Sequence, residues 1–323
     1  MRDHLDGFSD LSILVLGDVM LDRFIWGNVD RISPEAPVPV VHVEKEDFYP
    51  GGAANVARNL APFAKDVFVC GLIGMDGNGD TLQQTLNEAG VICTRMVRDP
   101  EFDTICKTRV IARQQQVVRI DRERRRALSR EQVEGILQNV QAMAGQIDGI
   151  ILEDYAKGFL DTRLVEGITR IAKQTGLVIT VDPNPRNPLP YHGVTAVKPN
   201  RKEAFEIAGM TDGLHPHPQP LVDKALLQAG RKLQGIWDTP NVLITLGEQG
   251  MLLLAQDEDP RHIPTSAKEV FDVSGAGDTA IALFTLALAA GKNPLRAAEI
   301  ANHASSRVVG KLGTAIVTPE DFG

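Results

Sequence analysis

Residues 272–290 have the sequence DVSGAGDTAIALFTLALAA, in which a turn of small residues passes directly into an apolar helix. Gly275, Ala276 and Gly277 let the backbone come close to an anion, and N–H groups at a helix start stabilise negative charge there. Asp278 falls in the first helical turn, where a carboxylate can take the proton of an attacking hydroxyl. The pattern therefore predicts a catalytic site for phosphoryl transfer. The structural alternative is an N-capped helix that follows a flexible turn.

Two common nucleotide-binding motifs do not account for this segment. The spacing Gly275-x-Gly277-x-x-Ala280 nearly matches the dinucleotide fingerprint, but no βαβ unit with a ribose-binding acid follows it. The sequence also lacks GxxxxGK[ST], the P-loop signature. A dehydrogenase is therefore disfavoured, and phosphate binding has to rely on helix N-termini and on separate cations.

Along the rest of the chain, short apolar runs alternate with helical stretches, and two predicted helices close it. Predicted strands lie at 11–16, 67–72, 149–152, 177–181, 196–198 and 241–246. Predicted helices lie at 55–63, 81–89, 131–143, 161–174, 200–208, 225–234, 275–290 and 294–310. Such alternation predicts a three-layer α/β/α fold with a mostly parallel central sheet. We interpret residues 1–323 as a single domain of this kind.

Two segments depart from the alternation. Prolines punctuate residues 21–45, which suits edge strands and loops, and residues 103–121 alternate apolar and polar side chains about a polar turn. A hairpin that is exposed on one face shows the second pattern. We expect the two segments to form one small β lid.

Composition excludes several classes of protein. The 34 Lys and Arg against 42 Asp and Glu give a net charge of −8, without the basic surface of a nucleic-acid binder. The longest apolar run, 280–290, is shorter than the roughly 20 residues that span a bilayer. The three widely spaced cysteines are typical of buried thiols in a reducing compartment. We expect a cytoplasmic protein without a nucleic-acid or membrane partner.

A second polar cluster points to a sugar. Gly51, Gly52 and Asn55 begin a predicted helix, and Asp18 and Asp22 follow the first predicted strand. Carboxylates, an amide and bare backbone are the groups that hydrogen-bond sugar hydroxyls. We therefore expect these five residues to bind a sugar. The alternative for each acid is a surface charge that faces the lid.

Through residues 51–55 and 272–279 the chain resembles the ribokinase-like (pfkB) family of carbohydrate kinases over nearly its whole length. NRKE at 200–203 is similar to the family's N-x-x-E segment, and TLGEQG at 245–250 is similar to its nucleotide loop. The resemblance implies the ribokinase-like fold, ATP and Mg²⁺ as cofactors, and Asp278 as the base beside an anion hole at 275–277.

The resemblance also implies which residues bind the nucleotide and the metal. The nucleotide-side residues are Asn200, Glu203, Thr245, Gly247, Gly250 and Asn302, and residues 310–313 resemble the adenine-side wall. Glu203 is implied for Mg²⁺, through water. Some relatives hold a monovalent cation such as K⁺ near the position of Asp272, and the sequence does not decide this. Without the resemblance, Asn200 and Glu203 are a helix N-cap and its reciprocal partner.

Longer strings resemble the heptose 7-phosphate kinases within this family. They are GDVMLDRFIWG, RISPEAPVPV, GGAANVARNLA, RQQQVVRID, EDYAKG and VVGKLGT. This implies ATP-dependent phosphorylation of D-glycero-β-D-manno-heptose 7-phosphate at O1, giving the 1,7-bisphosphate for ADP-heptose and lipopolysaccharide. Many such kinases are fused to an adenylyltransferase, for which 323 residues leave no room, so we expect the stand-alone kinase. The alternatives are a kinase for another sugar or sugar phosphate and a non-catalytic nucleotide- or sugar-binding module.

A 7-phosphate needs cations in a chain of net negative charge. We expect Arg113 in the lid hairpin or Lys157 after a strand to bind it, since charge-assisted donors hold phosphate well. Lys107, Arg109, Arg119 and Arg186 are competing candidates.

The lid also predicts an assembly. It contains apolar side chains, among them Trp26, that need a cover. A partner's lid can provide this cover, and we expect a homodimer through the lid.

Overall fold

The structure is a computed structural model that describes residues 5–113, 115–213, 217–265, 275–309 and 315–322. A nine-stranded sheet forms its centre, in the order β15-β14-β13-β12-β11-β10-β1-β4-β6. The parallel strands are β1 (Ser12–Gly17), β4 (Asp66–Cys70), β6 (Val91–Ile92), β10 (Gly149–Glu153), β11 (Val178–Asp182), β12 (Ala196–Val197) and β13 (Asn241–Thr245). β14 (Met251–Ala255) and β15 (Arg261–Ile263) continue the sheet in antiparallel fashion.

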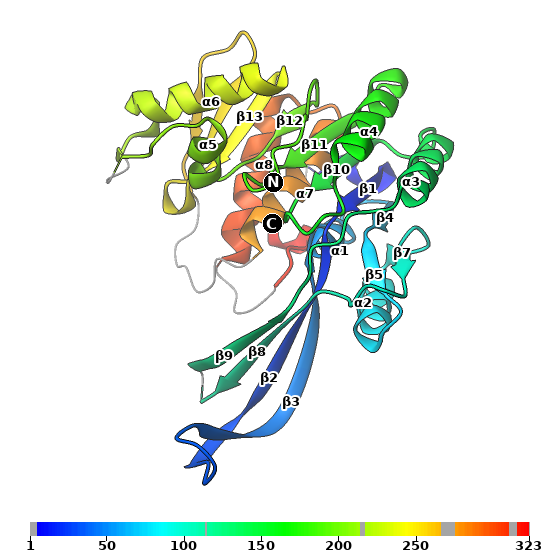
Figure 1. Ribbon diagram of the computed structural model, residues 1–323. Helices are drawn as coiled ribbons and strands as arrows, with labels where there is room; N and C mark the ends of the chain where they lie inside the picture. The colour runs from blue at the N-terminus through cyan, green and yellow to red at the C-terminus, as the bar shows by residue number, and fades with distance from the viewer. Residues whose placement is uncertain (1–4, 114, 214–216, 266–274, 310–314, 323) are drawn as a thin grey trace.

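Helices cover both faces of this sheet (Figure 1). One layer contains α1 (Ala53–Leu60), α2 (Gly77–Glu88), α7 (Ala276–Ala289) and α8 (Pro294–Val308). The other contains α3 (Arg130–Met143), α4 (Thr162–Thr175), α5 (Arg201–Ile207) and α6 (Lys224–Trp237). Every residue of β1 and β10 is buried, as expected of parallel strands covered on two sides. The predicted three-layer α/β/α fold is confirmed.

α7 is apolar around its whole circumference. All residues from 278 to 287 are buried, because the helix packs against the sheet, α1 and α8 at once. A helix that is apolar on every side belongs inside a protein. The start of α7, with Asp278, is therefore held in a fixed position.

A second sheet, in the order β3-β2-β8-β9, extends away from the body of the molecule (Figure 1). Its strands are β2 (Val19–Ile32), β3 (Pro39–Gly52), β8 (Cys106–Ala112) and β9 (Gln115–Arg122). Both segments expected in a lid, 21–45 and 103–121, contribute to it. β3 runs on to Gly52 and leads directly into α1, so this sheet is joined to the body at the glycine pair.

The remaining elements are short. β5 (Leu72–Gly74) pairs with β7 (Val97–Asp99), and brief 3-10 turns lie at Phe8–Asp10, Pro220–Val222, Gly247–Gln249 and Pro319–Phe322. Among the helices that the structure describes, none has the length and apolarity needed to cross a membrane.

Strand register determines which polar residues meet. Gly17 of β1 lies opposite Glu153 of β10, and Glu153 lies opposite Asp182 of β11. Lys198 follows β12, and Thr245 ends β13. Since the carboxyl ends of parallel strands open at one edge of a sheet, residues far apart in sequence gather there.

Candidate active site

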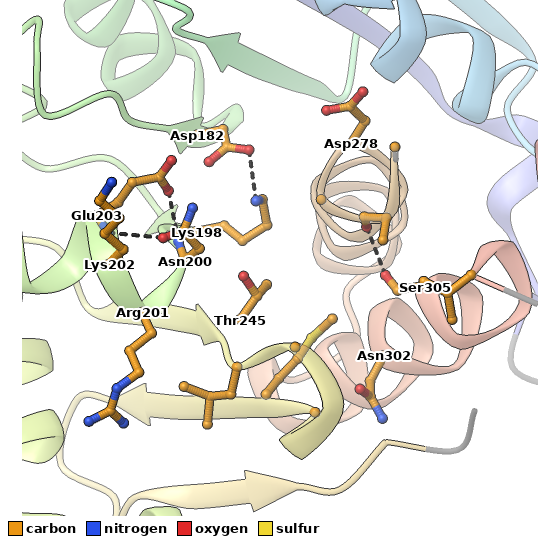
Figure 2. A pocket seen from close by; sticks show the side chains of 18 of the residues that line it. Asp182, Lys198, Asn200, Arg201, Lys202, Glu203, Thr245, Asp278, Asn302 and Ser305 are labelled. Atoms are coloured by element: carbon orange, nitrogen blue, oxygen red, sulfur yellow. Dashed lines mark hydrogen bonds and ion pairs between the residues drawn. The ribbon is translucent and has the colours of Figure 1, made fainter. Parts of the chain in front are cut away.

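A pocket of about 940 Å³ lies at this edge of the central sheet. Glu153, Asp182, Lys198 and Thr245, from four neighbouring strand ends, line it together with parts of α5, α7 and α8. Figure 2 shows Lys198 and Asp182 on one side and Asp278 at the start of α7 on the other. A concave site with a few convergent polar groups is typical of a ligand pocket.

Lys198 places a positive charge beside the start of α7. Its Nζ lies 2.7 Å from Asp182 Oδ2, and a Cβ added at Gly277 would lie 3.6 Å from Nζ. Burial alone would lower the pKa of Lys198, but Asp182 and Glu153 outweigh it and raise the pKa. Lys198 therefore stays an ammonium ion next to the predicted anion loop. The sequence analysis missed this residue, although its position at the end of the strand predicted at 196–198 was a usable signal.

Glu153 is the most deeply buried acid of the pocket, with 1% of its surface exposed. Burial, followed by the charges of Asp182 and Asp278, raises the pKa of Glu153 well above its usual range. Its Oε2 has no hydrogen-bond partner within the described part of the chain. Glu153 thus keeps its proton more readily than the neighbouring acids do.

The anion loop is the N-terminal turn of α7. Gly275 is the N-cap, with φ of 80°, a left-handed conformation that favours glycine. Ser305 Oγ of α8 donates a hydrogen bond to Ala276 O at 3.0 Å. The first N–H groups of a helix have no acceptor within it, so they remain available to an anion.

Asp278 lies in the first turn of α7 and is 8% exposed. Its Oδ2 accepts a hydrogen bond from Asn55 Nδ2 at 2.6 Å, and its Oδ1 accepts one from Tyr155 Oη at 3.1 Å. Burial raises the pKa of Asp278, and the contacts with Asn55, Lys198 and Tyr155 oppose the rise without cancelling it. A carboxylate with a raised pKa is a stronger base, as proton abstraction requires.

Asp18 performs a different task from the expected sugar contact. Its carboxylate accepts the backbone N–H groups of Tyr155, Lys157 and Phe159 at 2.9 to 3.0 Å, and only 4% of the residue is exposed. Asp18 therefore holds the loop that follows β10. A contact between Asp18 and a sugar stays a prediction.

The other expected sugar residues lie near the base. Asn55 bonds Asp278 directly, and the charge of Asp22 is close enough to raise the pKa of Asp278. A Cβ at Gly51 would lie 2.7 Å from Asp22 Oδ2, and one at Gly52 would lie 2.4 Å from a backbone oxygen. Asn55 therefore contacts the Asp278 carboxylate directly, and Gly51 lies beside Asp22 at the start of the second sheet.

The two cations expected to bind a phosphate lie in different places. Arg113 sits in the β8–β9 turn with 70% of its side chain exposed, 3.4 Å from Asp30. Lys157 lies beside Tyr155 in the loop held by Asp18, with its Nζ 2.8 Å from Glu123. Lys157 thus shares a loop with Tyr155, which contacts Asp278, whereas Arg113 lies in an exposed turn; phosphate binding by either residue stays a prediction.

The expected nucleotide-side residues all line the pocket; they are Asn200, Glu203, Thr245, Gly247, Gly250 and Asn302. Asn200 Oδ1 accepts the Glu203 N–H at 2.9 Å, and Glu203 Oε2 accepts the Asn200 N–H at 2.8 Å. This capping box starts α5 and turns Glu203 into the pocket. Burial raises the pKa of Glu203.

Two further predictions cannot be compared with the structure. Asp272, expected near a monovalent cation, and residues 310–313 lie outside the described residues. Within the described ranges, no cluster of three or more His, Cys, Asp or Glu side chains is arranged to hold a metal ion. Mg²⁺ does not require such a cluster, because it usually keeps several waters and uses one or two carboxylates.

The sequence profile of the pfkB family of carbohydrate kinases matches residues 10–321. The chain belongs to the pfkB family. It is 41% identical to the bifunctional protein HldE of Citrifermentans bemidjiense over 97% of this chain, and 43% identical to that of Caulobacter vibrioides over 98%. The chain spans 63% of the length of each of these relatives. The prediction of a sugar kinase is confirmed at the level of the family.

Solved structures of pfkB-like enzymes show the same fold. The inhibited tetrameric form of phosphofructokinase-2 from Escherichia coli matches with a TM-score of 0.76, at 18% identity over 96% of both chains. Ribokinase from Arabidopsis thaliana, complexed with ribose and ATP, matches with a TM-score of 0.71, at 19% identity over 97% of both chains. The predicted ribokinase-like fold is confirmed.

We predict that Asp278→Asn folds and binds ATP but loses about 10² to 10⁴-fold in kcat, because an amide cannot accept the hydroxyl proton. In the wild type, kcat should fall as the pH drops through the raised pKa of Asp278, since only the ionised carboxylate is a base. That loss should begin at a higher pH than for an ordinary aspartate. Steady-state kinetics across pH would measure both effects.

Asp80→Asn is the matched control, because Asp80 lies in the first turn of α2, far from the pocket lining. It should retain the kinetics of the wild type. A near-normal kcat in Asp278→Asn would remove Asp278 from the role of base.

Proposed function

We propose that the chain transfers the γ-phosphoryl group of ATP to O1 of D-glycero-β-D-manno-heptose 7-phosphate, giving the 1,7-bisphosphate used for ADP-heptose and lipopolysaccharide. The observation that carries the chemistry is the position of the Asp278 carboxylate, between the sugar-side residue Asn55 and the anion loop. The choice of sugar is supported by the resemblance of the longer strings to heptose 7-phosphate kinases and by the similarity to the bifunctional protein HldE over almost all of this chain.

In the proposed mechanism, Asp278 accepts the proton of the O1 hydroxyl as the oxygen attacks the γ-phosphorus. The new O1–P bond forms, the bond from the γ-phosphorus to the bridging oxygen breaks, and ADP leaves with the electron pair. N–H groups of the anion loop and the ammonium of Lys198 stabilise charge on the transferring group. Lys198 supplies the separate cation that a site without a P-loop lysine needs.

The carboxylates on the nucleotide side fit Mg²⁺. Glu203 and Asp182 both line the pocket, and Mg²⁺ is commonly held by one or two carboxylates, waters and substrate phosphates. When bound, the ion neutralises charge on the phosphates of ATP. We propose that Glu203 holds the ion through water. Asp182 has a second role, because its ion pair orients Lys198.

Product analysis by mass spectrometry would test this function, with ATP, Mg²⁺ and a panel of sugars and sugar phosphates. We expect heptose 7-phosphate to gain one phosphoryl group and the other acceptors to react far more slowly. Faster reaction of a different sugar would favour the alternative of another ribokinase-like kinase. A chain that binds ATP and forms no product with any acceptor would be a non-catalytic binding module.

We further propose that Lys157 and Lys107 bind the 7-phosphate. The Lys107 Nζ lies 5.9 Å from the centre of the Tyr155 ring, and its charge is close enough to that of Lys157 for the two to interact. Within the described residues, Lys107 has no ion-pair partner. A phosphate dianion would meet two ammonium groups here and would compete with Glu123, which lies 2.8 Å from the Lys157 Nζ.

We predict that Lys157→Ala and Lys107→Ala each raise KM for heptose 7-phosphate about ten- to a hundredfold, since a charge-assisted hydrogen bond contributes about 1.5 to 3 kcal/mol. The KM for ATP should stay unchanged. Arg113→Ala tests the other residue predicted to bind this phosphate, which lies in the exposed β8–β9 turn. Wild-type KM in both lysine variants would place the phosphate elsewhere, with Arg109, Arg119 and Arg186 as the next residues to test.

We also propose a homodimer that forms through the second sheet. Its exposed apolar side chains include Val43 at 56%, Val118 at 46% and Ile120 at 57% exposure, and such a surface is typical of an interaction site. Light scattering at micromolar concentration should give twice the mass of one chain, and a fully active monomer would contradict the proposal. The cytoplasmic location expected from composition stays a prediction.

A further inference from the structure

Tyr155 is held directly against the catalytic carboxylate. Its Oη donates a hydrogen bond to Asp278 Oδ1 at 3.1 Å, while Asn55 Nδ2 donates to Oδ2 at 2.6 Å. Each oxygen of the carboxylate therefore already accepts a proton donor from the protein. Tyr155 lies within the string EDYAKG, but the sequence analysis gave it no role, and the mechanism described above does not use it.

The backbone at Tyr155 is unusually well anchored. Asp18 accepts the N–H groups on both sides of Ala156, and Asp154 Oδ1 accepts the Ala156 N–H at 2.7 Å. Ala156 itself has φ of 57°, a left-handed conformation that costs energy in a residue other than glycine. Strain of this kind persists only where the surroundings impose it. The main chain of Tyr155 is thus held in place.

The tyrosine hydroxyl can act only as a donor towards this carboxylate. Burial raises the pKa of Tyr155 well above its usual value, and the charges of Asp278 and Glu153 raise it further. The hydroxyl therefore keeps its proton throughout the neutral range. It has the same hydrogen-bonding character as the sugar hydroxyl that Asp278 has to deprotonate.

In a kinase, a base that lies next to ATP can promote ATP hydrolysis when no sugar is bound. Water that reached the base could lose a proton to it and attack the γ-phosphorus, which would release ADP and inorganic phosphate. A carboxylate has about four lone-pair positions for hydrogen bonds, so two donors do not saturate it. Burial limits the access of water to the remaining lone-pair positions, because Asp278 is only 8% exposed.

We propose that Tyr155 Oη occupies the place of the acceptor hydroxyl on Asp278 until the sugar displaces it, and that it thereby suppresses ATP hydrolysis. Tyr155 is then a gating residue that acts through Asp278 and takes no part in the bonds that form or break. The inference rests on the proposed function in one respect, that Asp278 is the base. It does not depend on which sugar is the acceptor.

The test measures ADP release from ATP and Mg²⁺ without any sugar. Tyr155→Phe removes only the hydroxyl, and we expect its hydrolysis rate to rise about tenfold, below the 10² to 10⁴-fold of a fully oriented general base, because water is not held in line. The double variant Tyr155→Phe/Asp278→Asn should return to the wild-type rate or below, since the extra hydrolysis requires the base.

Tyr191→Phe is the matched control. It also removes a buried hydrogen bond from a tyrosine to an aspartate, Tyr191 Oη to Asp154 Oδ2 at 2.9 Å. Because Asp154 also anchors Ala156, this variant shows the effect of disturbing the loop while the hydroxyl at the base stays in place. Its hydrolysis rate should equal that of the wild type. Calorimetric titration with ATP would show that each variant is folded and binds the nucleotide.

Three results would overturn the inference. They are an unchanged hydrolysis rate in a Tyr155→Phe variant that binds ATP, a rise that persists in the double variant, and an equal rise in Tyr191→Phe. Failure of the proposed function would look different. If the chain phosphorylates no heptose 7-phosphate, yet Tyr155→Phe shows the rise in ATP hydrolysis that depends on Asp278, the assigned substrate is wrong and the role of Tyr155 stands.

Discussion

Burial of α7 on every side is the constraint from which the geometry of the site follows. Because residues 278–287 are enclosed by the sheet, α1 and α8, the N-terminal turn of the helix has one position relative to the strand ends. That turn carries both the N–H groups for a phosphoryl group and the carboxylate for a hydroxyl. A surface helix could shift by an ångström, and such displacements are costly in catalysis.

The same burial places several acids close together, and neighbouring groups reduce the net negative charge of the pocket. Asp278, Asp182, Glu153 and Glu203 share one pocket, and burial raises the pKa of each of them. The ammonium of Lys198 offsets one negative charge, and Glu153 lowers the net negative charge of the pocket further by retaining a proton. A site with this excess of acids accepts a polyphosphate only together with added cations, which agrees with a proposed role for Mg²⁺.

The acceptor side draws on both sheets. β2 and β8 of the second sheet contribute Asp22 and Lys107, whereas β10 of the central sheet leads into the loop that carries Tyr155 and Lys157. Asp18, between the two sheets, holds that loop through three backbone hydrogen bonds. The proposed base therefore lies at the junction of the two sheets, so changes in either sheet affect the Asp278 carboxylate.

By itself the sequence predicted the features that depend on near neighbours along the chain. The small residues before an apolar helix predicted the anion loop with Asp278, the alternation of strands and helices predicted the fold, and the reciprocal spacing of Asn200 and Glu203 predicted their capping box. Local geometry decides these features, because each involves residues at most a few positions apart.

Only the tertiary structure decided which distant residues share the pocket and what they do there. Lys198 and Tyr155 become neighbours of Asp278 through strand register across the sheet, over separations of 80 residues or more that no local pattern records. Asp18 matched a sugar-binding pattern, yet its carboxylate turns towards backbone N–H groups that become accessible only when β1 and β10 lie side by side. A side chain's partners depend on which strands pair and how they are aligned, and those are properties of the folded sheet as a whole.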